Sequence, residues 1–107
     1  MVKISILYPA KKNGTFNVDY YLNTHMPMSI KLLRTHAEFK GVSVERGLGG
    51  VMPDTKAAYV AMCHYLFDTF DGFLAAFLPH AATLQADMPN YTDIEPVMQV
   101  SEVAISQ

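Results

Sequence analysis

The 107-residue sequence predicts an α+β fold in which two helices cover one face of a four-stranded antiparallel sheet. Three observations predict it. Four segments have the apolar pattern of strands, two have the apolar stripe of helices, and the order is strand, helix, strand, strand, helix, strand. The chain is also close to the commonest size of one domain, so residues 1–107 are expected to form a single domain.

The first part of the chain predicts a strand and then an interrupted helix. Residues 2–8 alternate apolar and polar side chains, which is typical of a half-buried strand. Asn17 is the predicted N-cap of the helix. Pro27 removes a backbone donor and disfavours helical geometry at the preceding residue, so a kink is expected near residues 24–26. One stripe of this helix carries Tyr21, Leu22, His25, Met28, Leu32 and His36.

The other three strands are expected at residues 42–48, 57–67 and 94–105. The first alternates in the manner of a half-buried strand. The other two carry apolar residues on both faces, so both of their faces are expected to be covered. The three segments are bounded by glycine, proline and aspartate clusters that favour turns.

A second helix is expected to begin after Asp68 or Thr69 and to be kinked at Pro79. The resulting order is the split βαβ, or ferredoxin-like, βαββαβ arrangement with both helices on one sheet face. That arrangement leaves the other face bare. Because two strands are apolar on both sides, the sequence predicts a homodimer that packs sheet to sheet.

Composition excludes several classes of partner. Half of the residues are hydrophobic and only 17% are charged, with a net charge of −2 and no basic segment. Nucleic acid and anionic membranes are therefore not expected as partners. The N-terminus lacks a signal-like or membrane-spanning apolar run, and Cys63 is the single cysteine, so a cytoplasmic protein without disulfides is expected.

Four segments resemble the EthD family of the dimeric α/β-barrel superfamily: YYLNTHMP at 20–27, GLGG at 47–50, AAYVAMCHYLFDT at 57–69 and ADMPNYTDIEP at 86–96. The resemblance implies a ferredoxin-like protomer, a dimer whose two sheets form an α/β barrel, and a pocket between sheet and helices. The family is named for association with the degradation of an ether compound. Related branches resemble cofactor-independent monooxygenases, cyclases, dehydratases, isomerases and haem proteins, so fold kinship alone does not select a reaction.

His25 and Tyr21 are the candidate catalytic residues. They lie one turn apart on the core-facing stripe, and imidazole titrates near working pH, so His25 suits general acid–base catalysis. Tyr21 is the candidate hydrogen-bond donor to the same ligand. The alternative is structural: a buried His25 that bonds a carbonyl released by Pro27, and a Tyr21 that fills the core.

Four other residues are candidates for the pocket lining: His64, His80, Tyr91 and Met28. The alternation of its strand places His64 either in a pocket wall or in the dimer interface. In the loop before the last strand, Tyr91 is expected to close over the pocket. A neighbouring carboxylate is a candidate to orient a histidine, although Asp87 is interpreted mainly as a turn residue that holds the loop.

No metal or cofactor motif is found. The four histidines lack a zinc-ligand spacing, and GLGG lacks the lysine and the strand-to-helix context of a phosphate-binding loop. No metal and no cofactor are therefore expected, although no residue pattern excludes haem. Seven Met and twelve Phe or Tyr favour a small apolar or aromatic ligand. The leading hypothesis is a cofactor-independent oxidoreductase, lyase or isomerase; the alternatives are a non-catalytic binding module and a purely structural dimer.

Overall fold

The computed structural model describes all residues from 1 to 107 and contains one antiparallel sheet with strand order β2-β3-β1-β4. β1 is paired on one side with β3 and on the other with β4, and β2 is paired with β3. This is the predicted ferredoxin-like α+β topology, which is therefore confirmed. The strands are β1 (Val2–Pro9), β2 (Phe39–Arg46), β3 (Tyr59–Phe67) and β4 (Val97–Glu102).

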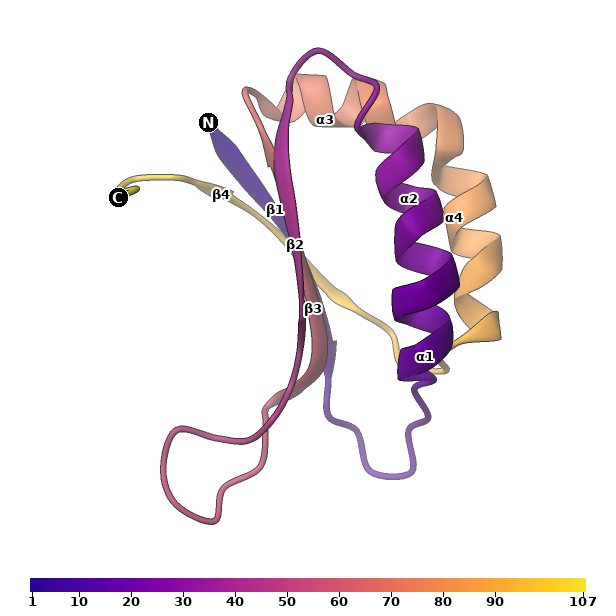
Figure 1. Cartoon of the computed structure of the whole chain (residues 1–107), viewed down its shortest axis with the longest axis vertical. Coiled ribbons are helices and arrows are strands. Elements are labelled where there is room, and N and C mark those ends of the chain that lie inside the picture. The colour runs from indigo at the N-terminus through magenta and orange to yellow at the C-terminus, as the bar shows by residue number, and fades with distance from the viewer.

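Two interrupted helical segments lie on the same side of the sheet (Figure 1). The first consists of α1 (Val18–Tyr20), a π-helical turn η1 (Tyr21–His25) and α2 (Met26–Leu33). The second consists of α3 (Phe70–Phe77), η2 (Leu78–His80), α4 (Ala81–Asp87) and η3 (Met88–Asn90). None of these helices is long and apolar enough to cross a membrane.

The caps and interruptions follow local sequence chemistry. The Asn17 side chain accepts a hydrogen bond from the Tyr20 amide, as predicted for an N-cap. Of the two candidates for the second cap, Thr69 does this, because its side chain accepts from the Gly72 amide. The interruption expected before Pro27 is present as the π-helical turn, and the interruption at Pro79 is a 3₁₀ turn.

The boundaries of three strands differ from the sequence prediction. β2 ends at Arg46 and β3 begins at Tyr59, each two residues short of the predicted bound. β4 starts at Val97, because Pro96 has no amide hydrogen to donate to the ladder. It ends at Glu102, because Glu102 pairs with Val2 at the start of β1 and no partner strand continues beyond that point. β2 begins at Phe39, which pairs with Phe67 at the far end of β3.

The core lies between the sheet and the helices. Ile4 and Tyr8 of β1 and Cys63, Tyr65 and Phe67 of β3 are each at most 3% exposed. Ile4 is paired with Tyr65 across the ladder, and side chains two residues apart on a strand share a face, so these residues form one apolar layer under the helices.

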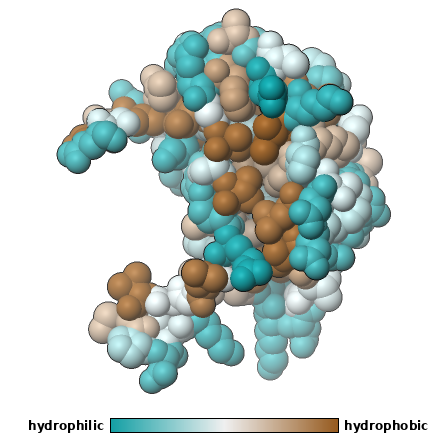
Figure 2. Space-filling model, in the orientation of Figure 1, coloured by the Kyte–Doolittle hydropathy of each residue, from teal (hydrophilic) through white to brown (hydrophobic).

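The opposite sheet face is uncovered, and two segments project past it (Figure 1). One is the connection between β2 and β3, and the other is the C-terminal end after β4. Figure 2 shows the molecule hollowed between these two projections. Their exposed apolar side chains include Leu48, Val51, Met52 and Ile105, which are 90%, 102%, 68% and 82% exposed.

Replacement of the α3 cap tests this description. Thr69→Ala is expected to lower the free energy of unfolding by about 0.5–2 kcal/mol, because the Gly72 amide loses its acceptor. Urea denaturation followed by circular dichroism measures the change. Thr83→Ala, at an exposed position of α4, is the control. An equal loss of stability in both variants would show that the cap contributes nothing specific.

Candidate functional site

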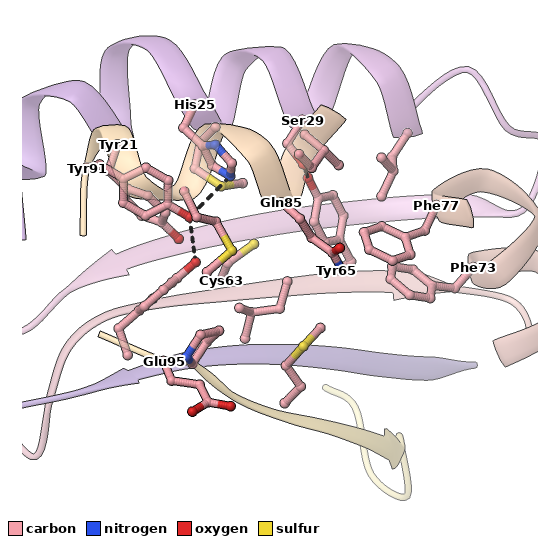
Figure 3. A pocket seen from close by; sticks show the side chains of 18 residues that line it. Tyr21, His25, Ser29, Cys63, Tyr65, Phe73, Phe77, Gln85, Tyr91 and Glu95 are labelled. Carbon is pink, nitrogen blue, oxygen red and sulfur yellow. Dashed lines mark hydrogen bonds between the residues drawn. The ribbon is translucent and has the colours of Figure 1, made fainter. Parts of the chain in front are cut away.

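A cavity of about 300 Å³ lies between the helices and the sheet. Thirteen of its eighteen lining residues are hydrophobic. Figure 3 shows a polar end near His25 and Tyr91 and an aromatic end at Phe73 and Phe77. The volume is at the lower end of the range for small-molecule sites, about 300–1,000 Å³. This unfilled volume weighs against the hypothesis of a purely structural dimer whose own side chains fill the pocket.

The π-helical turn places His25 at the polar end. The Met26 amide donates to the Tyr21 carbonyl, which is the five-residue spacing of a π turn. Pro27 follows directly and has no amide to continue the α-helical ladder. Tyr21 and His25 both face the core, and their rings stack with centroids 6.0 Å apart. Single π turns are frequent at functional sites.

Asp87 holds one edge of the imidazole ring. Its Oδ2 lies 2.9 Å from Nδ1 of His25, and both side chains are largely buried, at 15% and 8% exposed. Its other oxygen, Oδ1, accepts hydrogen bonds from the Tyr20 hydroxyl at 2.7 Å and from Nδ2 of Asn90 at 3.0 Å. Because a carboxylate can only accept, Nδ1 of His25 carries the hydrogen in this pair.

Desolvation alone would raise the pKa of the Asp87 carboxyl. The hydrogen bonds from Tyr20, His25 and Asn90 together outweigh it, so the pKa of Asp87 lies below its ordinary value of 3.8. Asp87 is therefore a fixed negative charge beside His25 at neutral pH. Such a charge stabilises the imidazolium that forms when the other ring nitrogen takes up a proton.

Two tyrosines continue the hydrogen-bonded chain on the cavity side of the imidazole. The Tyr91 hydroxyl lies 3.4 Å from Nε2 of His25 and 2.7 Å from the Tyr8 hydroxyl (Figure 3). Burial raises the pKa of both phenols, so both stay protonated at neutral pH. Asp87, His25, Tyr91 and Tyr8 thus form a continuous chain that ends in the wall of the cavity.

Tyr21 lines the cavity with its ring, but its hydroxyl is buried and has no hydrogen-bond partner. Burial also raises the pKa of this phenol. The cavity wall contains a second polar pair, the Ser29 and Tyr65 hydroxyls, which lie 2.6 Å apart and are hydrogen-bonded to each other. The thiol of Cys63 is buried, and desolvation raises its pKa to about 12, so it is not a nucleophile at neutral pH.

The structure brings three of the six predicted site residues to the cavity and places three elsewhere. His25, Tyr21 and Tyr91 line it. The assignment of His64, His80 and Met28 to the lining is corrected, because none of them borders this cavity.

The reason differs for each of these three residues. His64 lies on the uncovered sheet face, where Nδ1 is 2.7 Å from the Ser5 hydroxyl and Nε2 is 3.4 Å from Glu45. His80 ends the 3₁₀ turn at Pro79 and is half-buried outside the cavity. Met28 follows Pro27 in α2, and it packs on the core from a half-buried position.

Two residues of the hydrogen-bonded chain were not predicted as site residues. Asp87 was interpreted mainly as a turn residue, although it ends α4 and meets a histidine 62 positions earlier. Only its place in the ADMPNYTDIEP segment, next to Tyr91, points to a role at the site. Tyr8 is the next-to-last residue of β1, an ordinary amphipathic strand, and nothing in the sequence distinguishes its hydroxyl. No group of three or more His, Cys, Asp or Glu side chains is arranged to hold a metal ion.

These features define a ferredoxin-like α+β protein with a partly open, largely apolar cavity and a largely buried acid–base pair at one end. The chain belongs to the EthD domain family, whose pattern matches residues 16–95. No functionally curated protein matches the chain significantly.

Solved structures agree with this assignment. An EthD-like protein of Ralstonia eutropha JMP134 is 37% identical, with a TM-score of 0.89 over 99% of this chain and 94% of that one. An EthD family protein of Bacillus halodurans C-125 is 20% identical, with a TM-score of 0.68 over 95% and 97% of the two chains. SnoaB, a cofactor-independent oxygenase of Streptomyces nogalater, shares the fold at 13% identity, with a TM-score of 0.58 over 98% and 93%.

The lowered pKa of Asp87 predicts a pH dependence of stability. Stabilisation by the ionised carboxylate is fully present above the unfolded-state value of 3.8 and is lost as pH falls through the lower pKa of the folded protein. The loss of unfolding free energy in Asp87→Asn should therefore be larger at about pH 7 than at about pH 3. Chemical denaturation at both pH values measures it, with Asp54→Asn as the exposed control. A pH-independent difference would contradict the prediction.

Proposed function

We propose that this protein is a cytoplasmic, cofactor-independent enzyme that transfers a proton to or from a small, largely apolar compound, in catabolism or secondary metabolism. The observation that carries the proposal is the His25–Asp87 pair at the polar end of an apolar cavity, with Nδ1 of the imidazole 2.9 Å from the carboxylate. Tyr21 belongs to the proposal as a wall of the site rather than as a hydrogen-bond donor, because its hydroxyl is enclosed.

The geometry supports a general-base step. Nδ1 of His25 donates to Asp87, so Nε2 carries the lone pair and is the ring nitrogen on the side of Tyr91 and the cavity. Removal of a proton from an acidic C–H or O–H bond of the ligand leaves its electron pair on the ligand as an enolate or phenolate. The proton then resides on the imidazole as an imidazolium beside the Asp87 carboxylate.

This single step is common to several reactions. An enolate can be reprotonated at another carbon, can expel a neighbouring hydroxide in a dehydration, or can attack an internal carbonyl in a cyclisation. A carbanion that gives electrons to molecular oxygen is oxidised while the oxygen is reduced. Among these alternatives, the fold shared with a cofactor-independent oxygenase supports the reaction with molecular oxygen. The proton transfer itself uses only the acid–base pair of the chain.

Isotope exchange tests the proposal without knowledge of the natural substrate. The bicyclic ketone 2-tetralone is apolar and enolisable, and it is small enough for the cavity. In D₂O the wild type should accelerate deuterium uptake at its benzylic carbon, followed by NMR. His25→Ala should lower the enzyme-dependent rate by about 100-fold or more, which is the usual size of general-base catalysis. His36→Ala, outside the cavity, is the control.

The exchange test has three informative outcomes. A folded His25→Ala variant with unchanged exchange would contradict the role of His25. Unfolding of that variant would show that the residue is structural. A wild type that binds 2-tetralone without accelerating exchange would favour the competing hypothesis of a non-catalytic binding module, for which the mostly hydrophobic lining of the cavity is the supporting observation.

We also propose that a second copy of the chain occupies the hollow of the uncovered sheet face. Leu7 and Met62 are direct neighbours on that face, Val97 lies on the other side of Leu7, and Leu66 extends the row along β3. The two projections that flank the face carry exposed apolar side chains of their own (Figure 2). One chain therefore offers both a hollow apolar face and apolar projections that reach beyond it, which fits a two-fold pair of identical subunits.

Light scattering coupled to gel filtration tests the pairing. The wild type should have twice the chain mass of 11.9 kDa. Met62→Glu places a charge in the middle of the face and should yield monomers. Ala82→Glu, at an exposed position of α4 on the other side of the molecule, should leave the dimer intact. A monomeric wild type at high concentration would exclude the pairing.

A further inference from the structure

The polar end of the cavity contains a chain of four side chains, and the direction of each hydrogen bond in it can be assigned. Asp87 is ionised and only accepts, so His25 donates from Nδ1. A neutral imidazole with its hydrogen on Nδ1 accepts at Nε2, so the Tyr91 hydroxyl donates to it. Because the only hydroxyl hydrogen of Tyr91 is donated to His25, the Tyr8 hydroxyl must be the donor in its 2.7 Å hydrogen bond with the Tyr91 oxygen.

This assignment leaves one unsatisfied position. Every hydrogen in the chain points toward Asp87, and the oxygen of Tyr8, which lines the cavity, is the one acceptor in the chain without a donor. The Tyr91 hydroxyl lies next to Nε2 of His25, so it occupies the hydrogen-bonding position of that nitrogen. This link is the longest in the chain at 3.4 Å, and such contacts commonly tighten when a ligand binds.

We infer that the Tyr8 hydroxyl is the group that contacts the ligand. The site therefore selects ligands that carry an acidic hydroxyl, either a phenol or an enol, over ligands that can only accept a hydrogen bond. The inference rests on the proposed proton transfer and specifies its route. The ligand O–H bond breaks and its proton passes to Tyr8, while the Tyr8 proton passes to Tyr91 and the Tyr91 proton to Nε2 of His25. The products are a phenolate or enolate and an imidazolium beside Asp87.

The neutrality of both phenols fits this route. Tyr8 and Tyr91 resist ionisation because they are buried, so each gains one proton as it gives one up, and neither has to exist as a phenolate. The charge moves only between the ligand and His25. Asp87 then balances it with a carboxylate that Tyr20 and Asn90 hold in place through Oδ1.

The same two donors make Asp87→Asn a sharp test. Tyr20 and Asn90 both need an acceptor at the Oδ1 position, so they hold the new amide with its oxygen toward them and its nitrogen toward His25. That amide donates to Nδ1 and forces the imidazole hydrogen onto Nε2. His25 then donates to the Tyr91 oxygen, and Tyr91 donates to the Tyr8 oxygen. The Tyr8 hydroxyl is left free to donate a hydrogen bond into the cavity. One substitution inverts the direction of the whole chain.

The experiment compares two apolar bicyclic probes of similar size by calorimetry: 2-naphthol, which donates a hydrogen bond, and 2-tetralone, which only accepts. The wild type should bind 2-naphthol about 3- to 10-fold more tightly, the usual worth of one hydrogen bond. Tyr8→Phe should abolish that preference, and Asp87→Asn should shift it toward 2-tetralone. Tyr65→Phe removes a cavity hydroxyl that is bonded only to Ser29, and it should keep the preference.

Nitrogen NMR of labelled histidine gives an independent readout that needs no ligand. The wild type should show His25 with its hydrogen on Nδ1, and Asp87→Asn should show it on Nε2. A wild type protonated on Nε2, a preference that survives in Tyr8→Phe, or no binding of either probe would each overturn the inference. Loss of isotope exchange with an intact naphthol preference would overturn the proposed catalysis and leave the assigned ligand contact standing.

Discussion

The hydrogen bond between His25 and Asp87 is the constraint on which the rest of the site depends. It joins the π-helical turn of the first helical segment to the last residue of α4, two elements separated by 62 positions in sequence. Charge-assisted hydrogen bonds of this kind are about twice as strong as neutral ones. Loss of Asp87 leaves Nδ1 of the largely buried His25 unpaired, which costs more than the bond itself contributes.

The same bond organises the polar chemistry around it. It sets the imidazole tautomer, which in turn orders the two tyrosine hydroxyls between His25 and the cavity. Tyr20 and Asn90 support it from the outer side through the second carboxylate oxygen. The cavity therefore has a polar end with defined donors and acceptors, while Phe73 and Phe77 form an aromatic end beside Tyr65 and Gln85 (Figure 3).

The sequence predicted the fold because its signals are local. Alternation in β1, the Asn17 and Thr69 caps and the two prolines each act within a few residues, and together they define the element order. Periodicity placed Tyr21 and His25 on the inward side of the first helix, although it also placed Leu22 there, which is 40% exposed. It missed the buried Met26, Ser29 and Leu33, because the π turn shifts the inward side of the residues that follow it. Asp87 and Tyr8 were not predicted as site residues, because their roles depend on which side chains meet across the folded chain. His64 was ambiguous for the same reason, since alternation gives two faces without stating which one the helices cover.

The π-helical turn at residues 21–25 has a consequence for how this site can change. A π turn contains one residue more than an α-helix needs for the same stretch, and each residue of an α-helix advances its direction by about 100°. Deletion of a single residue from the turn would restore regular α-helix and rotate the imidazole relative to everything that follows. Loss of one codon would thus change the helical wall of the cavity and the position of its acid–base group together, while the sheet and its hollow face stay as they are.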